Sequence, residues 1–506
     1  MSESTGAPNT AAETRCITWE AWSAVAFERA TEERKPVLLA LSAFWCRGCD
    51  VMDRTSYRDP RVIDLVATKF VPVKVDADRR PDINARYNLD GWPTTAVLTP
   101  DGEIMTGSTY LPTDALIAML DEASTALTER YDELRARGAE IANARRASQG
   151  NARYEPDGEA PGWLLTRAFD EHDPVHGGFG SGGKFLHAGV LRFVLEMYQR
   201  THDRRAADIV TRSLDAICRG GHGDIVDGGF FRYVAGRDFT RPHTEKLLED
   251  QIAAIDLLLR AAVVFGRPEY RESAVDAIGY VTRSLSDPSR GGFFASQKAD
   301  DEYYALSGSL RASLEAPAVD RSLFTDLNAQ AIITWLDAAE ALGHRQFAEF
   351  AVHTRSRVLA GTHRGEQGHA HWVGEDGTHD LLADQVHSAR TSVRLFEVTR
   401  DPRDLDQAAA AMQQVVRRFW DAGGSGFFDR AIDASDEIGK LADRIKPVSL
   451  NSLAAQVLMR IAALTGKSEW RVLARQALGA VTGTYRAHGL GAAPYALATF
   501  DVLVSD

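Results

Sequence analysis

The spacing of hydrophobic positions divides the 506-residue chain into two parts. Before about residue 112, short apolar runs alternate with amphipathic helical stretches, which is typical of an α/β domain. Val37–Leu41 is a continuous apolar run, as expected of a strand that is buried on both faces. Beyond Pro161, strand signals nearly vanish and apolar positions follow the helical period. The sequence therefore predicts an α/β domain followed by an all-helical one.

The first part contains the elements of a small α/β domain. A helix is expected over Thr18–Glu33, with Thr18 as its N-cap. We place this domain at residues 1–147 and a linker at 148–160, where the sequence turns polar. The other expected elements are strands at Val71–Asp76, Thr94–Leu98 and Glu103–Thr106, a short helix at Pro81–Tyr87 and a long helix over roughly Thr113–Arg146.

Long helices come in pairs in the second part, and a glycine-rich loop follows each pair. Two flanking helices bring the number to about twelve, in a repeat of about 50–65 residues. Twelve helices are enough to form six hairpins, which would close into an (α/α)6 toroid over residues 161–506. An open solenoid is the alternative, but its repeats seldom carry long glycine-rich aromatic loops. The expected helices lie near 161–170, 184–201 and 203–219, 245–266 and 268–285, 322–343 and 345–360, 380–398 and 402–419, 449–466 and 468–486, and 494–505.

Composition narrows the class of protein. A chain with 44% hydrophobic and 25% charged residues is an ordinary globular protein, and its length predicts more than one domain. The net charge of -13 works against binding to nucleic acid or to an anionic membrane. The polar first residues do not resemble a signal peptide, and four cysteines suit a reducing compartment. We expect a cytoplasmic protein with no nucleic-acid or membrane partner.

A dithiol motif, Cys46-Arg47-Gly48-Cys49, lies between the strand at Val37–Leu41 and a helix. The N–H groups at the helix start and the charge of Arg47 would stabilise a thiolate on Cys46. Cys49, one turn later, could then resolve a mixed disulfide, so we expect Cys46 exposed and Cys49 buried. A structural dithiol is the alternative. A zinc site is disfavoured because the sequence offers no second pair of ligands nearby.

The motifs around this dithiol, and others later in the chain, resemble one family. It is the group of thioredoxin-domain proteins that includes the spermatogenesis-associated thioredoxin-like protein of animals. The resemblance implies a thioredoxin-like domain with Pro93 against the dithiol and Trp45 and Trp92 at the substrate, followed by a six-hairpin glycosidase-like toroid. The chain departs from thioredoxins in having Ala40 where they bury an aspartate, which favours a specialised thiol enzyme over a general reductase. The motifs that carry the resemblance include Trp45-Cys46-Arg47-Gly48-Cys49, Gly91-Trp92-Pro93, Gly229-Phe230-Phe231-Arg232-Tyr233, Pro242-His243-Thr244-Glu245-Lys246 and Asp326-Leu327-Asn328.

A second candidate site lies in the toroid. His243 and Glu245 are expected to form an acid–base pair, and Arg232 and Lys246 to bind a carboxylate or phosphate. The alternative is that these charges only cap helices and form salt bridges. Further candidate substrate-binding residues are Asp227, Tyr233, Asp250, Asp300, Asp326 and Asp384, and the aromatic rings expected to stack on a sugar-like ring are Phe179, Phe230, Phe293 and Phe427.

Four histidines, His363, His369, His371 and His379, form a loose cluster in the sequence. We interpret it as a solvated loop, so neither a metal nor a cofactor is expected.

Three functions are compatible with these residues. The first is a thiol–disulfide oxidoreductase whose toroid selects the substrate. The second is a carbohydrate-active isomerase or hydrolase with a regulatory dithiol domain, and the third is a non-catalytic, redox-sensing interaction protein. The expected partners are a small, possibly sugar-like molecule or a protein thiol as substrate, and a cellular disulfide reductant.

Overall fold

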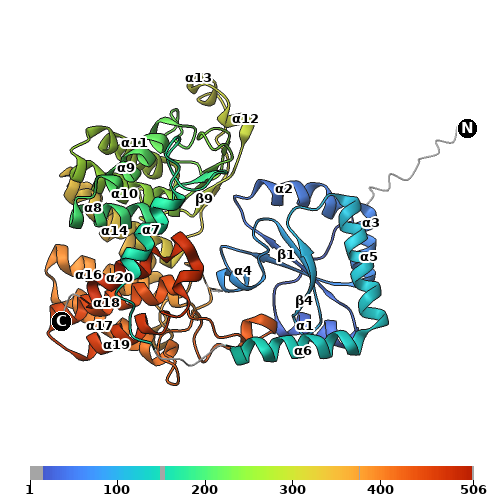
Figure 1. Cartoon of the computed structure of the whole chain (residues 1–506). Coiled ribbons are helices and arrows are strands. Elements are labelled where there is room, and N and C mark those ends of the chain that lie inside the picture. Colours follow the sequence, from blue (N-terminus) through green and yellow to red (C-terminus); the bar gives the residue numbers. More distant parts are fainter. Residues whose placement is uncertain (1–14, 149–153, 375–376, 504–506) are drawn as a thin grey trace, which may run out of the picture. The chain divides into compact units, whose positions relative to one another are not determined.

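The structure, a computed structural model, describes residues 15–148, 154–374 and 377–503. It divides into two compact units (Figure 1). The first consists of residues 1–145 together with Asp436–Ala442, and the second of Arg146–Ser435 and Asp443–Asp506. We describe each unit by itself.

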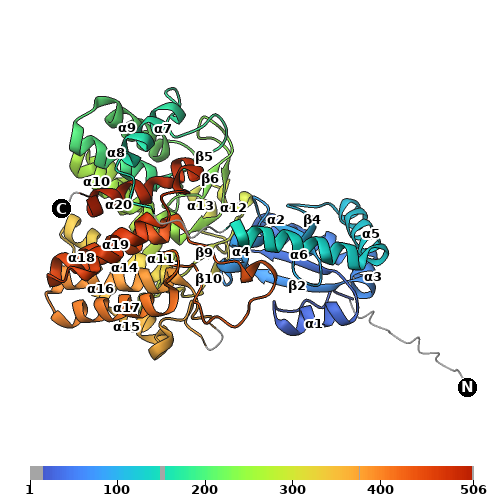
Figure 2. The ribbon, with the colours of Figure 1, turned by 60° about the horizontal axis from the view of Figure 1, so that its bottom comes forward.

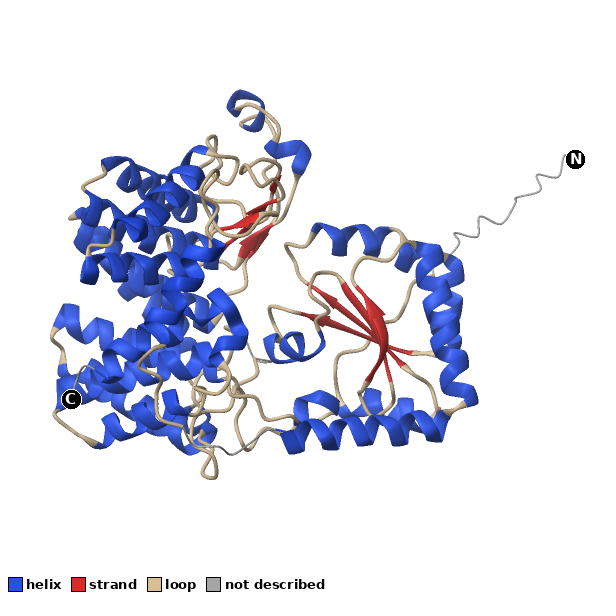
Figure 3. Ribbon diagram, in the orientation of Figure 1, coloured by secondary structure: helices blue, strands red, loops and turns tan. Residues whose placement is uncertain are grey.

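A four-stranded sheet forms the centre of the first unit, with helices on both faces (Figure 3). The strand order is β2–β1–β3–β4, in which β1 runs parallel to β2 and antiparallel to β3. Side chains of β1 alternate between two cores, with Leu39 and Leu41 in one and Leu38 and Ala40 in the other. The strand is therefore buried on both faces, as its unbroken apolar run predicts. The strands are β1 (Val37–Ser42), β2 (Val71–Asp76), β3 (Thr94–Leu98) and β4 (Ile104–Ser108).

Helices of the first unit divide between the two faces of the sheet. Side chains of α1 and α4 pack on the Leu39 face, and those of α2, α3 and α5 on the Leu38 face. The expected bounds of β2, β3 and α4 are confirmed. The helices are α1 (Ala24–Glu32), α2 (Arg47–Arg54), η1 (Ser56–Arg58), α3 (Pro60–Lys69), α4 (Pro81–Tyr87), α5 (Thr113–Glu129) and α6 (Tyr131–Ser148).

Two helix predictions in this unit are wrong. The first helix begins at Ala24 rather than Thr18, because the Ser23 hydroxyl caps it by accepting a hydrogen bond from the Ala26 N–H at 3.3 Å. The long helix breaks at Arg130, whose backbone leaves the helical region. At the break the buried Tyr131 ring lies under the Arg34 guanidinium, 3.8 Å from its centroid. A tertiary contact thus accompanies the break within a sequence of high helical propensity.

The second unit consists of long helices that lie side by side (Figure 2), and their contacts form a closed ring. Each inner helix contacts the next along the chain, and α20 contacts α8, so the ring closes. This confirms the (α/α)6 toroid over the open solenoid. The inner helices are α8 (Ala188–Thr201), α10 (Leu248–Phe265), α14 (Thr325–Leu342), α16 (Leu382–Thr399), α18 (Val448–Thr465) and α20 (Ala493–Leu503), and their outer partners are α9 (Arg204–Arg219), α11 (Pro268–Ser284), α15 (Arg345–Thr362), α17 (Pro402–Phe419), α19 (Glu469–Gly479) and α7 (Ala160–Glu171).

Long loops precede the N-terminal ends of the inner helices and carry short elements that the sequence did not predict. Two three-stranded sheets, in the orders β5–β6–β7 and β10–β9–β8, lie in these loops. Among described helices, α18 alone is long and apolar enough to cross a membrane, but it belongs to the inner ring. The short elements are β5 (Lys184–Phe185), β6 (Tyr233–Val234), β7 (Pro242–His243), β8 (Lys246–Leu247), β9 (Ser296–Gln297), α12 (Asp301–Tyr304), α13 (Gly308–Arg311), β10 (Val319–Asp320), η2 (Gly365–Gln367), η3 (Gly439–Ala442) and η4 (Tyr485–Ala492).

The glycine-rich loops share one hydrogen-bonding device. In the first turn of an inner helix, the side-chain amide of a Gln or Asn bonds one loop residue twice. It accepts a hydrogen bond from the backbone N–H of that residue and donates one to its C=O. Gly229 has φ +76°, and a Cβ there would lie 2.6 Å from the Tyr280 ring, so glycine is required. The loop phenylalanines are buried, so they do not form the expected stacking wall. The four pairs are Gln251 with Phe230, Asn328 with Phe293, Gln385 with His369 and Asn451 with Phe427.

Part of the expected linker belongs to the second unit. Residues 149–153 lie outside the described residues, but the segment that follows packs against α19 and η4. The Asp157 N–H donates to Tyr495 Oη at 2.9 Å, and the Tyr485 hydroxyl donates to Asp157 Oδ2 at 2.6 Å. The Tyr154 carbonyl covers Gly479 so closely that a Cβ there would lie 2.1 Å from it. Tyr154–Glu159 is thus a strap of the toroid.

A segment expected in the toroid belongs instead to the first unit. Leu441 is buried in the core that contains Tyr87. The Lys440 N–H donates to Tyr87 Oη at 2.9 Å, and Arg80 forms an ion pair with Asp436 at 2.7 Å. The hydrophobic pattern could not predict this, because Asp436–Ala442 has no regular period of its own.

Candidate functional site

The dithiol lies where the chain leaves β1 and enters α2. Cys46 and Cys49 form a disulfide. Cys46 is the N-cap of α2, and its Sγ accepts a hydrogen bond from the Cys49 N–H at 3.0 Å. Donation from the helix start stabilises negative charge on this sulfur when the bond is reduced. Both side chains are buried, with 4% and 5% exposed, so the expected contrast between them is absent in the disulfide form.

Aromatic rings and a proline loop surround the disulfide. Pro93 follows a cis peptide bond, and a Cβ on Gly48 would lie 2.9 Å from its Cδ, which leaves room only for glycine. The Trp45 and Trp92 rings meet edge to face at 5.3 Å. The Trp45 indole N–H also donates to Asp78 Oδ2 at 3.0 Å, which fixes the ring beside the cysteines. The residues predicted for this site are thus brought together.

An ion pair joins β2 to α2 one helical turn beyond Cys49. Ala40 faces the core, and its partner in the β1–β2 register is Lys74. The Lys74 Nζ bonds both carboxylate oxygens of Asp53 at 2.7 Å, and Asp53 lies one helical turn after Cys49. Arg47, in contrast, is exposed at the first position of α2.

Several residues predicted for the toroid site serve the scaffold. Lys246 is fully buried and donates to Asp224 at 2.7 Å and to the Gly228 carbonyl at 2.8 Å, so it is not available to a ligand. Asp227 pairs with Arg311 at 2.9 Å. Asp300 is the exposed N-cap of α12 and accepts from the Tyr303 N–H.

His243 does not form the predicted pair with Glu245. Its ring is exposed and stacks on Tyr233 at 3.9 Å, and Tyr233 stacks on Phe185 at 4.7 Å. Glu245 is buried and faces Arg232, with 3.5 Å between guanidinium and carboxylate. Successive strand residues point to opposite faces, so β7 turns His243 outward.

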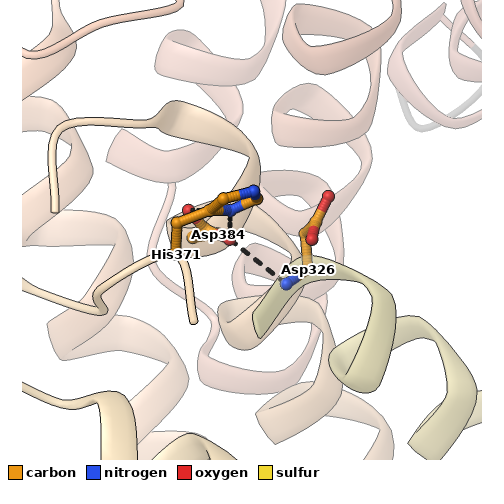
Figure 4. Close-up of side chains that lie close together, drawn as sticks. All are labelled: Asp326, His371 and Asp384. Carbon is orange, nitrogen blue, oxygen red and sulfur yellow. Dashed lines mark hydrogen bonds and ion pairs between the residues drawn. The ribbon is translucent and has the colours of Figure 1, made fainter. Parts of the chain in front are cut away.

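Asp326, Asp384 and His371 come together at the N-terminal ends of α14 and α16 (Figure 4). The His371 Nδ1 lies 3.0 Å from both oxygens of Asp384, and the Asp326 N–H donates to Asp384 Oδ1 at 3.2 Å. His371 and Asp384 are almost fully buried. One ligand atom from each of the three residues lies within 4.8 Å of the others. We call this group the Asp–His cluster.

Further acids from α10 extend the charge around the Asp–His cluster. Burial raises the pKa of Asp326 to about 6, and the nearby negative charges of Asp384 and Glu249 act in the same direction. Burial, followed by the neighbouring Glu249, raises the pKa of Asp250 well above its usual value. Burial also raises the pKa of Glu249, and the Arg232 guanidinium opposes this shift. Several buried carboxyl groups therefore lie near one another, with few positively charged side chains to balance them.

This arrangement suits proton transfer. A carboxylate that accepts from Nδ1 holds the imidazole in one orientation and leaves Nε2 as the basic nitrogen. A carboxyl group with a pKa near 6 can both give and take a proton at neutral pH. The spacing would also admit a divalent cation, since imidazole and carboxylate oxygens are common metal ligands. Such an ion would have to share Asp384 with the His371 hydrogen bond.

His371 and Glu249 were missed in the sequence. His371 lies in a loop that looked solvated, yet this loop contains His369, which is bonded by Gln385 one residue after Asp384. The signal in the sequence is the Gln or Asn that recurs in the first turn of the inner helices. It would have indicated that this loop packs against the start of α16. Glu249 directly precedes Asp250 in the first turn of α10 and was not singled out.

The fold and the dithiol together define the class: a thioredoxin-like domain that carries a Cys46–Cys49 pair, followed by an (α/α)6 toroid. Residues 8–146 match the family model Thioredox_DsbH, described as "Protein of unknown function, DUF255". The N-terminal domain is therefore a member of this family.

Curated relatives match about half of this chain. The chain is 29% identical over 307 residues to "Spermatogenesis-associated protein 20" of Homo sapiens, covering 56% of this chain and 39% of that protein. It is 28% identical over 253 residues to an uncharacterized protein of Caenorhabditis elegans, covering 46% and 35% of the two chains. The chain thus spans less than half the length of these curated relatives.

Solved structures match the toroid. A D-mannose isomerase has a TM-score of 0.54 and 10% identity, covering 69% of this chain and 98% of that chain. A sugar epimerase from a ruminal bacterium has a TM-score of 0.52 and 12% identity, covering 64% and 84%. At these identities the likeness shows the fold alone.

Proposed function

We propose that this protein is a thiol–disulfide oxidoreductase whose reactive pair is Cys46 and Cys49, with the toroid as its substrate-binding part. The observation that carries the proposal is the position of Cys46 Sγ as the N-cap of α2, where it accepts from the Cys49 N–H beside the Trp92–Pro93 loop. A sulfur in this position is a good thiolate and a good leaving group.

The two cysteines supply both electrons that the reaction requires. The Cys46 thiolate attacks a substrate disulfide, and one substrate sulfur leaves as a thiolate. Cys49 then loses its proton and attacks Cys46 Sγ, which forms the Cys46–Cys49 disulfide and releases the second substrate thiolate. The substrate gains two electrons, and a cellular reductant returns two to the protein. A protein disulfide or a small disulfide could serve as substrate in this direction, and a protein thiol would react with the Cys46–Cys49 disulfide by the same steps in reverse.

Trapping the mixed disulfide tests this proposal. The reduced full-length chain is mixed with glutathione disulfide and analysed by mass spectrometry. We expect Cys49→Ser to accumulate glutathione on Cys46 and Cys46→Ser to abolish exchange. Cys218→Ser, which removes an unpaired, part-buried thiol, is the matched control and should behave as wild type. Glutathione on Cys218 or Cys16 alone would contradict the proposal.

The Asp–His cluster supports a second candidate function, proton transfer on a polyhydroxylated substrate. The buried His371–Asp384 pair beside Asp326 favours it. Sugars related to the substrates of the structural neighbours, such as D-mannose and cellobiose, are the first to test in D₂O by NMR. We expect exchange of the C2 proton in wild type, lost about 100-fold or more in His371→Asn. Asp300→Asn, outside the cluster, is the control, and equal exchange in both variants would refute this function.

A further inference from the structure

The inner helices of the toroid enclose a cavity of about 1090 Å³. All six contribute to its lining, from Gly189 in the first turn of α8 to Glu397 near the end of α16. None of the three residues of the Asp–His cluster lines it. The cavity extends to the C-terminal ends of the inner helices, where short turns lead to the outer ones. It therefore begins one turn beyond Asp326 and Asp384, at Gln330 and His387, and does not include the cluster itself.

Polar contacts join the inner helices around this cavity and satisfy its acidic side chains. Asp256 is held by two arginines, as is Asp337, and Glu397 is held by Arg394 and Arg460. The contacts run in order around the ring: Arg192–Asp256 at 3.5 Å, Arg260–Asp337 at 3.5 Å, Asp337–Arg394 at 2.7 Å, Glu397–Arg460 at 2.5 Å, Gln456–Asp501 at 2.7 Å and Phe500–Arg200 at 4.0 Å to the ring centroid.

Arg390 stands apart from this network. It lines the cavity from the middle of α16, yet within the described residues it has no hydrogen bond and no ion pair. Burial, together with repulsion by Arg192, lowers its pKa to about 10, so it stays cationic at neutral pH. Arg390 is partly exposed, and Asp256 and Asp337 attract it without bonding it, so its N–H groups face the cavity without a protein acceptor among the described residues.

His387 lies one turn before Arg390 and also lines the cavity. Its Nδ1 is buried and has no partner among the described residues. Burial lowers the pKa of His387 to about 3, so the ring is neutral and can donate one hydrogen bond. Apolar side chains form much of the remaining wall: Leu195, Leu259, Ile333, Val393, Leu453 and Leu497.

We propose that this cavity binds a small organic anion, whose carboxylate or phosphate group pairs with Arg390 and whose apolar body lies against the leucine and valine side chains. A guanidinium binds either group through two parallel hydrogen bonds, and His387 can supply a third. Asp256 and Asp337 attract Arg390 but form their ion pairs with other arginines, so neither is bonded to it. The volume lies just above the range of about 300–1,000 Å³ that is typical of small-molecule sites.

Titration calorimetry and thermal melting of the full-length chain test this proposal. The probes are hexanoate and phenyl phosphate, with acetate and inorganic phosphate as headgroups without an apolar body, all at constant ionic strength. We expect one molecule of hexanoate or of phenyl phosphate to bind per chain, more tightly than its bare headgroup. Whichever of the two binds identifies the headgroup.

Arg390→Met should weaken this binding by about tenfold or more. It should also raise the melting temperature without probe, because it removes a part-buried charge that makes no hydrogen bond and is repelled by Arg192. Arg345→Met, on the exposed face of α15, is the matched control and should change neither quantity. The proposal is overturned if neither probe binds up to about 10 mM, if Arg390→Met binds as wild type does, or if the bare headgroups bind equally well.

Discussion

The dithiol site and the Asp–His cluster differ in the groups that make them polar. At the dithiol, a backbone N–H bonds the Cys46 sulfur, two indole rings meet beside the cysteines, and Lys74 and Asp53, one helical turn beyond Cys49, neutralise each other. At the Asp–His cluster, ionisable side chains are themselves desolvated, and Asp326 and Asp250 have raised pKa values. Buried acids with few counter-charges oppose folding, as is common where function requires them. Substitutions should therefore change chemistry alone in the first region, but chemistry and stability together in the second.

The largest expected effect distinguishes a buried charge of the toroid scaffold from a more exposed one. Asp224→Ala leaves Lys246 buried without a carboxylate, which should cost about 3–5 kcal/mol in the unfolding free energy of the toroid. Asp227→Ala removes a more exposed partner of Arg311 and should cost less than about 1 kcal/mol. Urea denaturation followed by circular dichroism measures both. Equal losses would show that Lys246 is not a structural cation.

The strap gives a smaller effect. A toroid fragment that begins at Tyr154 keeps the hydrogen bonds of Asp157 to Tyr485 and Tyr495, whereas one that begins at Pro161 loses them. At about 1 kcal/mol per bond, plus lost packing, we expect the shorter fragment to melt about 5 °C lower. Calorimetry of the two fragments is the measurement. Identical melting temperatures would mean that the segment is only a linker.

Asp326 should make stability depend on pH in the acid range. Its pKa is about 6 in the folded chain and 3.8 when unfolded, so the folded state keeps its proton to higher pH. Wild type therefore loses stability as pH rises from about 4 to 6. The melting temperature of Asp326→Asn relative to wild type should rise over that range and then level off. Asp300→Asn, at an exposed cap, should show a constant difference, and a flat difference for Asp326→Asn would contradict this.

The smallest effect concerns Arg47. Its charge favours the Cys46 thiolate and hence the reduced form, so Arg47→Ala should make the reduction potential more negative. Because Arg47 is exposed, the shift should be at most about 20 mV. A redox titration against glutathione measures it. A shift several times larger would mean that Arg47 acts on the sulfur without solvent screening.

Local patterns predicted the fold well where neighbours in sequence determine it. The apolar run of β1, the proline at the start of α4 and the paired helices of the toroid all lie where expected. The start of α1 and the break before Tyr131 were missed, because a serine cap and a tertiary stacking contact determine them. The dithiol site was predictable because four consecutive residues and one loop form it.

The toroid site was only partly predictable. Asp326 and Asp384 were named because they lie at the starts or loops of hairpins. Arg232, Glu245 and Asp250 were named because they belong to one glycine-rich loop and the segment after it. The structure places the starts of α10, α14 and α16 at the same end of the ring. The orientation of loop side chains was not predictable. Two-residue strands turn His243 outward, while a loop that looked solvated brings His371 inward. Strands of two residues are too short to produce a recognisable alternation of apolar and polar positions in the sequence.

Asp436–Ala442 has a consequence for the order of events during synthesis. The ribosome completes the sheet of the first unit early, but Leu441, which fills the core beside Tyr87, is added roughly 300 residues later. At about 5–20 residues per second, that interval is on the order of 15–60 s. The nascent first unit spends this time with an unfilled apolar surface near Tyr87. A chaperone that binds the emerging chain would find its target there, and release would coincide with the arrival of Leu441.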